Sequence, residues 1–211
     1  MDGKIRRAGD EDVGALLAFC RVAFPDAPKW QGADFVARRW WRAAMRSPIA
    51  EVWVVDQEVG PTGFVVVALD QGAWARARRD RYGSPLYRLF GLARRPRLLV
   101  RVLRARRERV RLAGAAARIG ESAAADHAAE RRAWLSLIAV AERERGSGLA
   151  RRLMDHAEAR ALAAGCEGIA LVVDYHNSRA QAFYRKLGYE EEGWRYRLPL
   201  FVKRLDADGN R

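Results

Sequence analysis

The sequence predicts an α/β fold built on a mixed sheet, and two observations lead to this class. Short apolar runs of strand length alternate with stretches of helical periodicity along the 211 residues, which is typical of strands and helices packed in layers. Two of the runs, at 51–56 and 62–69, are joined by a Gly60-Pro61 turn, which predicts an antiparallel hairpin. We therefore expect a sheet that is mixed rather than wholly parallel.

The composition favours a folded cytoplasmic protein without bound metal. Half of the residues are hydrophobic and 31% are charged, so a chain of this length can bury a core. The two cysteines, Cys20 and Cys166, stand apart and offer neither a disulfide framework nor a CxxC metal motif. The first residues lead into no apolar stretch of a secretion signal, and no run reaches the roughly 18 apolar residues of a membrane span.

The first 70 residues are expected to contribute three strands and two helices. A short strand is predicted around Ile5, and a helix over 13–23 follows an acidic start. A second helix is predicted over 34–45, ahead of the hairpin.

The last 80 or so residues again alternate between strand and helix. The pattern predicts a strand over 134–140, a helix over 147–164, a strand over 168–173 and a helix over 178–187, with β-like sequence at the end. Gly165 is expected to end the first of these helices.

The positive charge is concentrated in one segment. The whole chain carries +13, and residues 76–111 hold 14 arginines against two acidic residues, a balance of +12. After Pro96 the apolar residues Leu99, Val102 and Leu103 keep helical spacing between the arginines. We therefore predict amphipathic helices over 85–112, followed by an Ala-rich stretch to residue 130.

The loop over 140–150 is the part of the sequence most informative about chemistry. It reads VAERERGSGLA and lies between a buried strand and an amphipathic helix. Glycines at such a junction let the backbone approach an anion, and the first amides of the helix can bind phosphate oxygens. A tight turn without a ligand is the alternative interpretation. The glycines match neither the P-loop nor the G-x-G-x-x-G pattern, which disfavours those two nucleotide-binding classes.

This loop resembles motif A of the GNAT superfamily of acyl-CoA N-acyltransferases, Q/R-x-x-G-x-G/A. It fits in two registers, Arg143-x-x-Gly146-x-Gly148 and Arg145-x-x-Gly148-x-Ala150. A second block is similar to the family's next motif. That block consists of an apolar strand followed by Asn177, Ala180, Tyr184 and Gly188-Tyr189. Two blocks in the family's order are more specific than either block alone.

The resemblance implies the GNAT fold, a central mixed and mostly antiparallel sheet flanked by helices. It covers residues 134–193 well and 4–69 more loosely, so residues 1–211 would form a single domain. The arginine-rich segment, bounded at 71–130, would be a helical insertion between the third and fourth strands, where a typical member has a short turn.

The resemblance also assigns contacts for acetyl-CoA as co-substrate. Backbone groups of Ile138 and Val140 would bind the thioester and the pantetheine arm. Asn177 would bind the pantetheine amides, although Asn is equally suited to cap the helix that begins at Ser178. Consecutive backbone amides would hold the pyrophosphate: Arg145, Gly146, Ser147, Gly148, Leu149 and Ala150. No metal is implied.

By the same resemblance the reaction is direct N-acetyl transfer in a ternary complex. Tyr184 would protonate the leaving thiolate, with core packing as its alternative role. A base, usually a carboxylate, must keep the attacking amine neutral. Glu142 is slightly favoured because the bend before the loop faces the acceptor side in related folds. Glu51, Asp70 and Asp174 remain alternatives.

The sequence leaves open the identity of the acceptor and the role of the insertion. The expected acceptor is a small-molecule primary amine, for which an amino sugar is suggested by fold-level analogy, with a protein or ribosomal protein as the alternative. The insertion is interpreted as a lid or homodimer surface, as a segment that docks residues 85–112 on an anionic membrane surface, or as a nucleic-acid contact. Nucleic acid is the less favoured of the last two. The membrane interpretation would make the protein peripheral at the inner membrane surface. In the alternative function, the GNAT scaffold acts mainly as a binding module for a membrane or for RNA through this segment, and catalysis is secondary.

Overall fold

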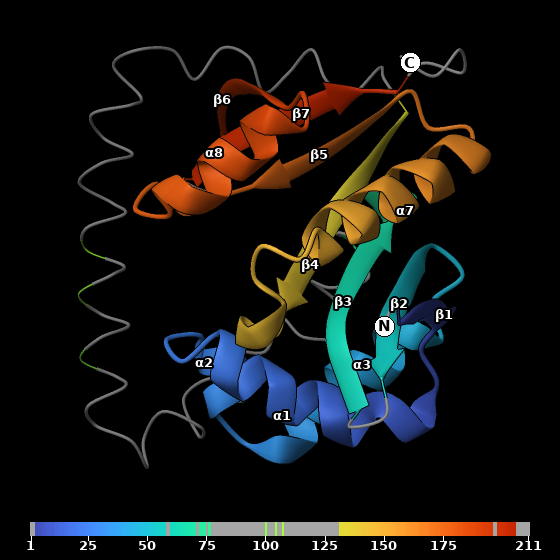
Figure 1. Cartoon of the computed structure of the whole chain (residues 1–211), viewed down its shortest axis with the longest axis vertical. Helices are drawn as coiled ribbons and strands as arrows, with labels where there is room; N and C mark the ends of the chain where they lie inside the picture. Colours follow the sequence, from blue (N-terminus) through green and yellow to red (C-terminus); the bar gives the residue numbers. More distant parts are fainter. Residues whose placement is uncertain are drawn as a thin grey trace.

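In the described part of the chain, a seven-stranded sheet is covered by helices on both faces (Figure 1). The structure, a computed structural model, describes residues 3–57, 60–70, 72–74, 76, 100, 104, 107, 131–195 and 198–205. The strand order is β1-β2-β3-β4-β5-β7-β6, and β4 and β5 are parallel while the other described neighbours are antiparallel. The predicted mixed, mostly antiparallel sheet is confirmed.

The N-terminal part contains the three strands and two main helices that the sequence predicts. In chain order its elements are β1 (Lys4–Arg7), a 3-10 turn η1 (Asp10–Asp12), α1 (Val13–Ala23), a short α2 (Pro28–Gln31), α3 (Asp34–Met45), β2 (Ala50–Gln57) and β3 (Gly60–Ala68). The predicted Gly60-Pro61 turn is wrong, because both residues already pair with β2. A proline fits the first positions of a strand, where its missing N–H leaves no ladder bond unmade.

The C-terminal part follows the prediction to within two residues at each boundary. Its elements are β4 (Arg132–Val140), a 3-10 turn η4 (Glu142–Glu144), α7 (Leu149–Ala163), β5 (Gly168–Val172), α8 (Ser178–Lys186), β6 (Glu190–Arg195) and β7 (Leu198–Arg204). The β-like end of the sequence forms the pair β6 and β7, and β7 lies between β6 and β5 in the sheet.

The arginine-rich segment lies between β3 and β4, as predicted. Within 71–130 the described residues are 72–74, 76, 100, 104 and 107, and they are helical. The rest of the predicted helices over 85–112, with the docking surface expected there, and the Ala-rich stretch lie outside the described residues.

Each face of the sheet carries its own apolar core. The core beneath α1, α2 and α3, which we call the α1–α3 face, is rich in aromatic rings. Trp30, Trp40, Trp41 and Phe64 form stacked and edge-to-face pairs with ring centroids 5.0–5.5 Å apart. The other core, the α7–α8 face, consists mainly of aliphatic side chains from α7, β3, β4 and β5 with tyrosines from the α8 region.

A bulge in β4 changes which side chains face each core. Residues 66–67 of β3 lie opposite Leu137 and Leu135, so Ser136 is an extra residue in β4. Leu135 before the bulge and Ile138 after it both pack on the α7–α8 face, although strict alternation would place them on opposite faces. The bulge therefore decides which side chains flank the carboxyl-terminal half of β4.

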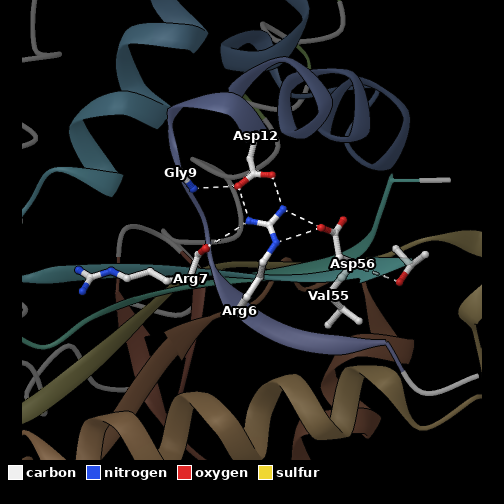
Figure 2. Close-up of polar contacts among 7 residues, drawn as sticks. Arg6, Arg7, Gly9, Asp12, Val55 and Asp56 are labelled. Atoms are coloured by element: carbon white, nitrogen blue, oxygen red, sulfur yellow. Dashed lines mark hydrogen bonds and ion pairs between the residues drawn. The ribbon is translucent and has the colours of Figure 1, made fainter. Parts of the chain in front are cut away.

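An ion-pair network joins β1 to β2 and to the start of α1 (Figure 2). The Arg6 guanidinium donates to the two oxygens of Asp12 at 2.7 and 2.8 Å and to Asp56 at 2.7 and 2.9 Å. Asp12 is buried and also accepts from the Gly9 amide at 2.8 Å. Hydrogen bonding to Arg6 lowers the pKa of Asp12 below its ordinary value.

We expect Asp12→Asn to lower the free energy of unfolding by about 1–3 kcal/mol at pH 7, because a buried carboxylate that accepts three hydrogen bonds loses its charge. Since the folded pKa lies below the unfolded value of about 3.9, this contribution is present above about pH 4 and is lost as the pH falls further. Urea unfolding at pH 7 and pH 3 measures both effects.

The control is Asp10→Asn. Asp10 is 48% exposed and pairs with Arg46 at the surface, so its loss should change stability by less than about 1 kcal/mol. Equal destabilisation by the two variants at pH 7 would contradict the role of Asp12.

Candidate active site

The parallel strands β4 and β5 pair over only three residues and then part. Residues 132–134 lie opposite residues 168–170, and no further pair joins the two strands in the described residues. Beyond this point β4 runs on to Val140 and β5 to Val172. Figure 1 shows the two strands diverging toward their carboxyl ends. We call this diverging region, from Trp134 and Ala170 onward, the splay.

The peptide groups of Ile138 and Val140 face the splay. Ala141 donates its amide to the Thr62 carbonyl at 2.7 Å, so the Ala141 amide points toward β3. Successive residues of a strand direct their peptide groups to alternate sides, and those of Val140 and Ile138 therefore point away from β3. On that side the described residues provide no strand partner beyond Trp134. These are the backbone groups that the resemblance assigns to the thioester and pantetheine.

The loop between β4 and α7 presents amides that are not hydrogen-bonded. Gly146 and Gly148 have φ angles of 87° and 85°, in the left-handed region that favours glycine. A Cβ at either position would meet nothing within 4 Å, so the backbone is open here. Among the described residues no partner accepts from the amides of Gly146, Gly148, Ala150 and Arg151. Such donors at the start of the 15-residue helix α7 suit the oxygens of a pyrophosphate.

The other amides of the loop are used within it. Arg145 donates to the Glu142 carbonyl at 3.1 Å, and Ser147 donates its amide and its hydroxyl to the Glu144 carbonyl. Leu149 donates to the Ser147 hydroxyl at 3.2 Å and buries its side chain in the α7–α8 face. Of the six predicted amides, those of Gly146, Gly148 and Ala150 therefore have no acceptor among the described residues. The Arg151 amide, which the motif does not include, is a fourth such donor. The position of Arg151 in the first turn of the helix could have pointed to it.

Glu142 lies in η4, just past the end of β4. Its side chain is 84% exposed and pairs with Arg145 at 2.9 Å. The role of Glu142 as the base stays a prediction.

Two of the alternative bases are engaged elsewhere. Glu51 is buried on β2 and accepts two hydrogen bonds of 2.8 Å from Arg160 of α7. Hydrogen bonding to Arg160 lowers the pKa of Glu51. Asp70 accepts from the Ala73 amide at 2.8 Å and lies near the start of β4, away from the open end of the splay. Both carboxylates therefore have local structural roles.

Asp174 is the alternative base that the fold does bring to the splay. It follows β5 directly and accepts from the His176 amide at 3.1 Å. Asn177 lies in the same loop and caps α8, since its Oδ1 accepts from the Ala180 amide at 3.1 Å. The capping interpretation is confirmed, and the contact of Asn177 with pantetheine stays a prediction.

Tyr184 lies on the buried side of α8. It is 8% exposed and contacts Phe183 and Tyr189 with ring centroids 5.3 and 5.7 Å apart. It belongs to the apolar cluster that also contacts Ile138 and Val140. Burial raises the pKa of Tyr184 well above its ordinary value, and its hydroxyl donates to no described residue. The raised pKa keeps the Tyr184 hydroxyl protonated at neutral pH, so the hydroxyl can donate its proton to a nearby anion.

Comparison with known proteins identifies the family. The model of the acetyltransferase (GNAT) family matches residues 15–189. The chain belongs to this family. No curated protein matches the sequence. Membership of the GNAT family implies an acyl-CoA-dependent acetyltransferase and confirms the resemblance found in the two motifs.

Solved structures share the fold at low identity. An N-acetyltransferase from Staphylococcus aureus has a TM-score of 0.58 at 14% identity, with 98% of this chain and 100% of that chain covered. A GNAT-family acetyltransferase from Streptococcus pneumoniae has a TM-score of 0.54 at 16% identity, with 96% and 99% covered. The ribosomal-protein-S18-alanine N-acetyltransferase from Escherichia coli has a TM-score of 0.52 at 13% identity, with 98% and 96% covered. At these identities the likeness shows the fold alone.

The described residues contain no group of three His, Cys, Asp or Glu side chains that could hold a metal ion. None of their helices combines the length and hydropathy that crossing a membrane requires.

We expect Gly148→Ala to weaken acetyl-CoA binding about tenfold or more. A non-glycine residue at a φ of 85° costs about 1 kcal/mol, and relieving that strain would turn the amides of the loop away from the phosphates. Calorimetry with acetyl-CoA measures the dissociation constant.

Gly165→Ala is the matched control, since Gly165 has a φ of 74° at the opposite end of α7. It should cost similar stability and leave the dissociation constant unchanged. If both variants weakened binding equally, the loop would not be the phosphate site.

Proposed function

We propose that this chain is an N-acetyltransferase that moves an acetyl group from acetyl-CoA to a primary amine by direct transfer in a ternary complex. One observation carries the proposal: the splay of β4 and β5 exposes unpaired peptide groups, and open amides lie at its carboxyl end. Family membership supports the acyl-CoA dependence.

The residues fit acetyl-CoA at two places. The amides of Gly146, Gly148, Ala150 and Arg151 suit the pyrophosphate, because backbone donors at a helix start bind anions without side-chain entropy loss. The pantetheine arm carries amides of its own and can pair with Ile138 and Val140 much as a further strand would. When bound, acetyl-CoA supplies the activated acetyl group.

Transfer joins the amine nitrogen to the acetyl carbon and breaks the bond from that carbon to sulfur. The Tyr184 hydroxyl donates its proton to the departing thiolate, and its raised pKa keeps that proton available. The amine gives up a proton to a carboxylate at the open end of the splay, directly or through water. We favour Glu142 and Asp174 for this role, because they follow the ends of β4 and β5.

The proposal extends to the acceptor and to a further partner. An amino sugar rests on fold-level analogy, with a protein N-terminus as the alternative. Docking on an anionic membrane surface through residues 85–112 rests on the balance of +12 in residues 76–111 and on the apolar residues between the arginines.

We expect Tyr184→Phe to lower kcat by about 10²–10⁴-fold while the dissociation constant for acetyl-CoA stays within about twofold of the wild-type value. Calorimetry measures binding, and release of free thiol measures turnover. Because activity requires the protonated hydroxyl and burial raises its pKa, Tyr184 should cause no loss of wild-type activity below about pH 10.

The matched control is Tyr189→Phe. Tyr189 is buried in the same core, but its hydroxyl donates to Glu158 at 2.9 Å, so its loss should leave kcat near the wild-type value. Unchanged turnover in Tyr184→Phe would remove Tyr184 from the acid role. Failure of the wild-type chain to bind acetyl-CoA at millimolar concentration would reject the proposed function itself.

A further inference from the structure

We propose that His156 makes the attachment of α7 to β2 sensitive to pH, because a protonated His156 ring competes with Arg160 for the carboxylate of Glu51. The inference does not depend on the proposed acetyl transfer, since it concerns the connection of a helix to the sheet. It follows from a cluster of four side chains on the α7–α8 face: His156 and Arg160 of α7, and Glu51 and Trp53 of β2.

The His156 ring lies against β2 with one of its nitrogens buried and unpartnered. The ring meets the Trp53 ring edge-on at a centroid distance of 4.3 Å. Its Nε2 atom is closed off from solvent, and no described residue makes a hydrogen bond to it. A neutral ring tolerates this place when its proton is on Nδ1, because Nε2 then carries only a lone pair. Protonation would add an N–H donor and a positive charge at the buried nitrogen.

The carboxylate that acts on His156 already accepts three hydrogen bonds. Glu51 is buried, and each of its oxygens accepts from the Arg160 guanidinium at 2.8 Å. Its Oε2 atom also accepts from the Trp53 indole N–H at 3.0 Å. Hydrogen bonding to Arg160 lowers the pKa of Glu51, so this group stays a carboxylate. A protonated His156 therefore displaces one of these donors or stays without an acceptor, and either result weakens the contact between α7 and β2.

The charged groups of α7 near His156 oppose its protonation or are engaged elsewhere. Arg152 and Arg160 lie one turn before it and one turn after it, so two cations flank the ring along the helix. The two acids beside it on α7 form other ion pairs: Asp155 with Arg151 at 3.9 Å, and Glu158 with Lys203 at 2.7 Å.

The strands beneath α7 add one more cation and apolar side chains. Arg7 of β1 lies opposite Trp53 in the sheet register. The described residues of β3 on this face include Val65 and Val67, which are buried and uncharged. Burial, followed by the charge of Arg160, lowers the pKa of His156 below its ordinary value, while the charge of Glu51 acts in the opposite direction.

The direction of the pH effect follows from this lowered pKa. Folded His156 binds a proton less readily than the same residue in the unfolded chain, whose pKa is about 6.5. The contact of α7 with β2 therefore contributes its full stability above about pH 6.5, and the contribution falls as the pH drops below that value. Acid thus weakens the attachment of α7 to the N-terminal half of the sheet.

The first test compares urea unfolding of the wild-type chain and of His156→Phe at pH 7.5 and pH 5.5. Phenylalanine keeps an aromatic ring against Trp53 and does not titrate. On acidification we expect the unfolding equilibrium constant to rise at least about threefold more in the wild-type chain than in this variant. His176→Phe is the matched control, because His176 is exposed in the loop after β5, and it should keep the wild-type pH dependence. Equal pH dependence of the wild-type chain and His156→Phe would overturn the proposal.

A second measurement uses the wild-type chain and so does not depend on the folding of His156→Phe. NMR follows the ring signals of His156 as the pH is lowered, and the midpoint should lie below the ordinary value of about 6.5. A midpoint at or above that value would contradict the proposal. In Trp53→Phe the midpoint should rise, because loss of the indole N–H leaves an oxygen of Glu51 able to accept from His156.

Amide hydrogen exchange at pH 5.5 shows where the effect lies. The amides of α7 should be less protected in the wild-type chain than in His156→Phe, and this loss should exceed that of α3 on the other face of the sheet. If α3 lost as much protection as α7, His156 would act on overall stability and not on the attachment of α7, and the proposal would be wrong.

Discussion

The three-residue pairing of β4 with β5 is the constraint on which the rest of this structure depends. Each strand keeps a longer antiparallel partner on its outer side, β3 beside β4 and β7 beside β5, so the sheet survives as two halves after the inner strands part. The bulge at Ser136 lies where the parting begins, and a bulge bends its strand and increases the local twist. The peptide groups that result have no strand partner among the described residues, and polar backbone groups need one. In the proposed function the amides of the pantetheine arm would be that partner.

Two sheet halves joined by so few pairs need another connection, and α7 provides it. Arg160 of α7 pairs with Glu51 on β2 at 2.8 Å, while Glu158 of the same helix accepts from Lys203 on β7 at 2.7 Å. One helix thus carries ion pairs to both halves, and its first turn also bears the open amides of the glycine loop. The same helix therefore connects the two halves of the sheet and positions these amides.

The two faces of the sheet differ in the side chains that they offer. The α7–α8 face holds the buried Tyr184 and the helix whose first turn offers amides to phosphate, both of which suit the handling of the thioester and its leaving group. The α1–α3 face offers aromatic and aliphatic surface, to which the insertion contributes Trp74.

The sequence by itself determined the features that short stretches of chain control. Helix α3, the stop at Gly165, the glycine loop and the cap at Asn177 follow from periodicity, glycine conformation and capping, which act over a few residues. Only the tertiary structure decided the bulge at Ser136, since nothing in the strand-like pattern over 134–140 marks an extra residue. It also decided the ion pair of Glu51 with Arg160, since Arg160 lies 109 positions away. It also decided that Trp74 of the insertion donates a hydrogen bond to Ser136 of β4. The reason is physical: register and ion pairs between distant residues arise when whole elements pack, and no local pattern encodes them.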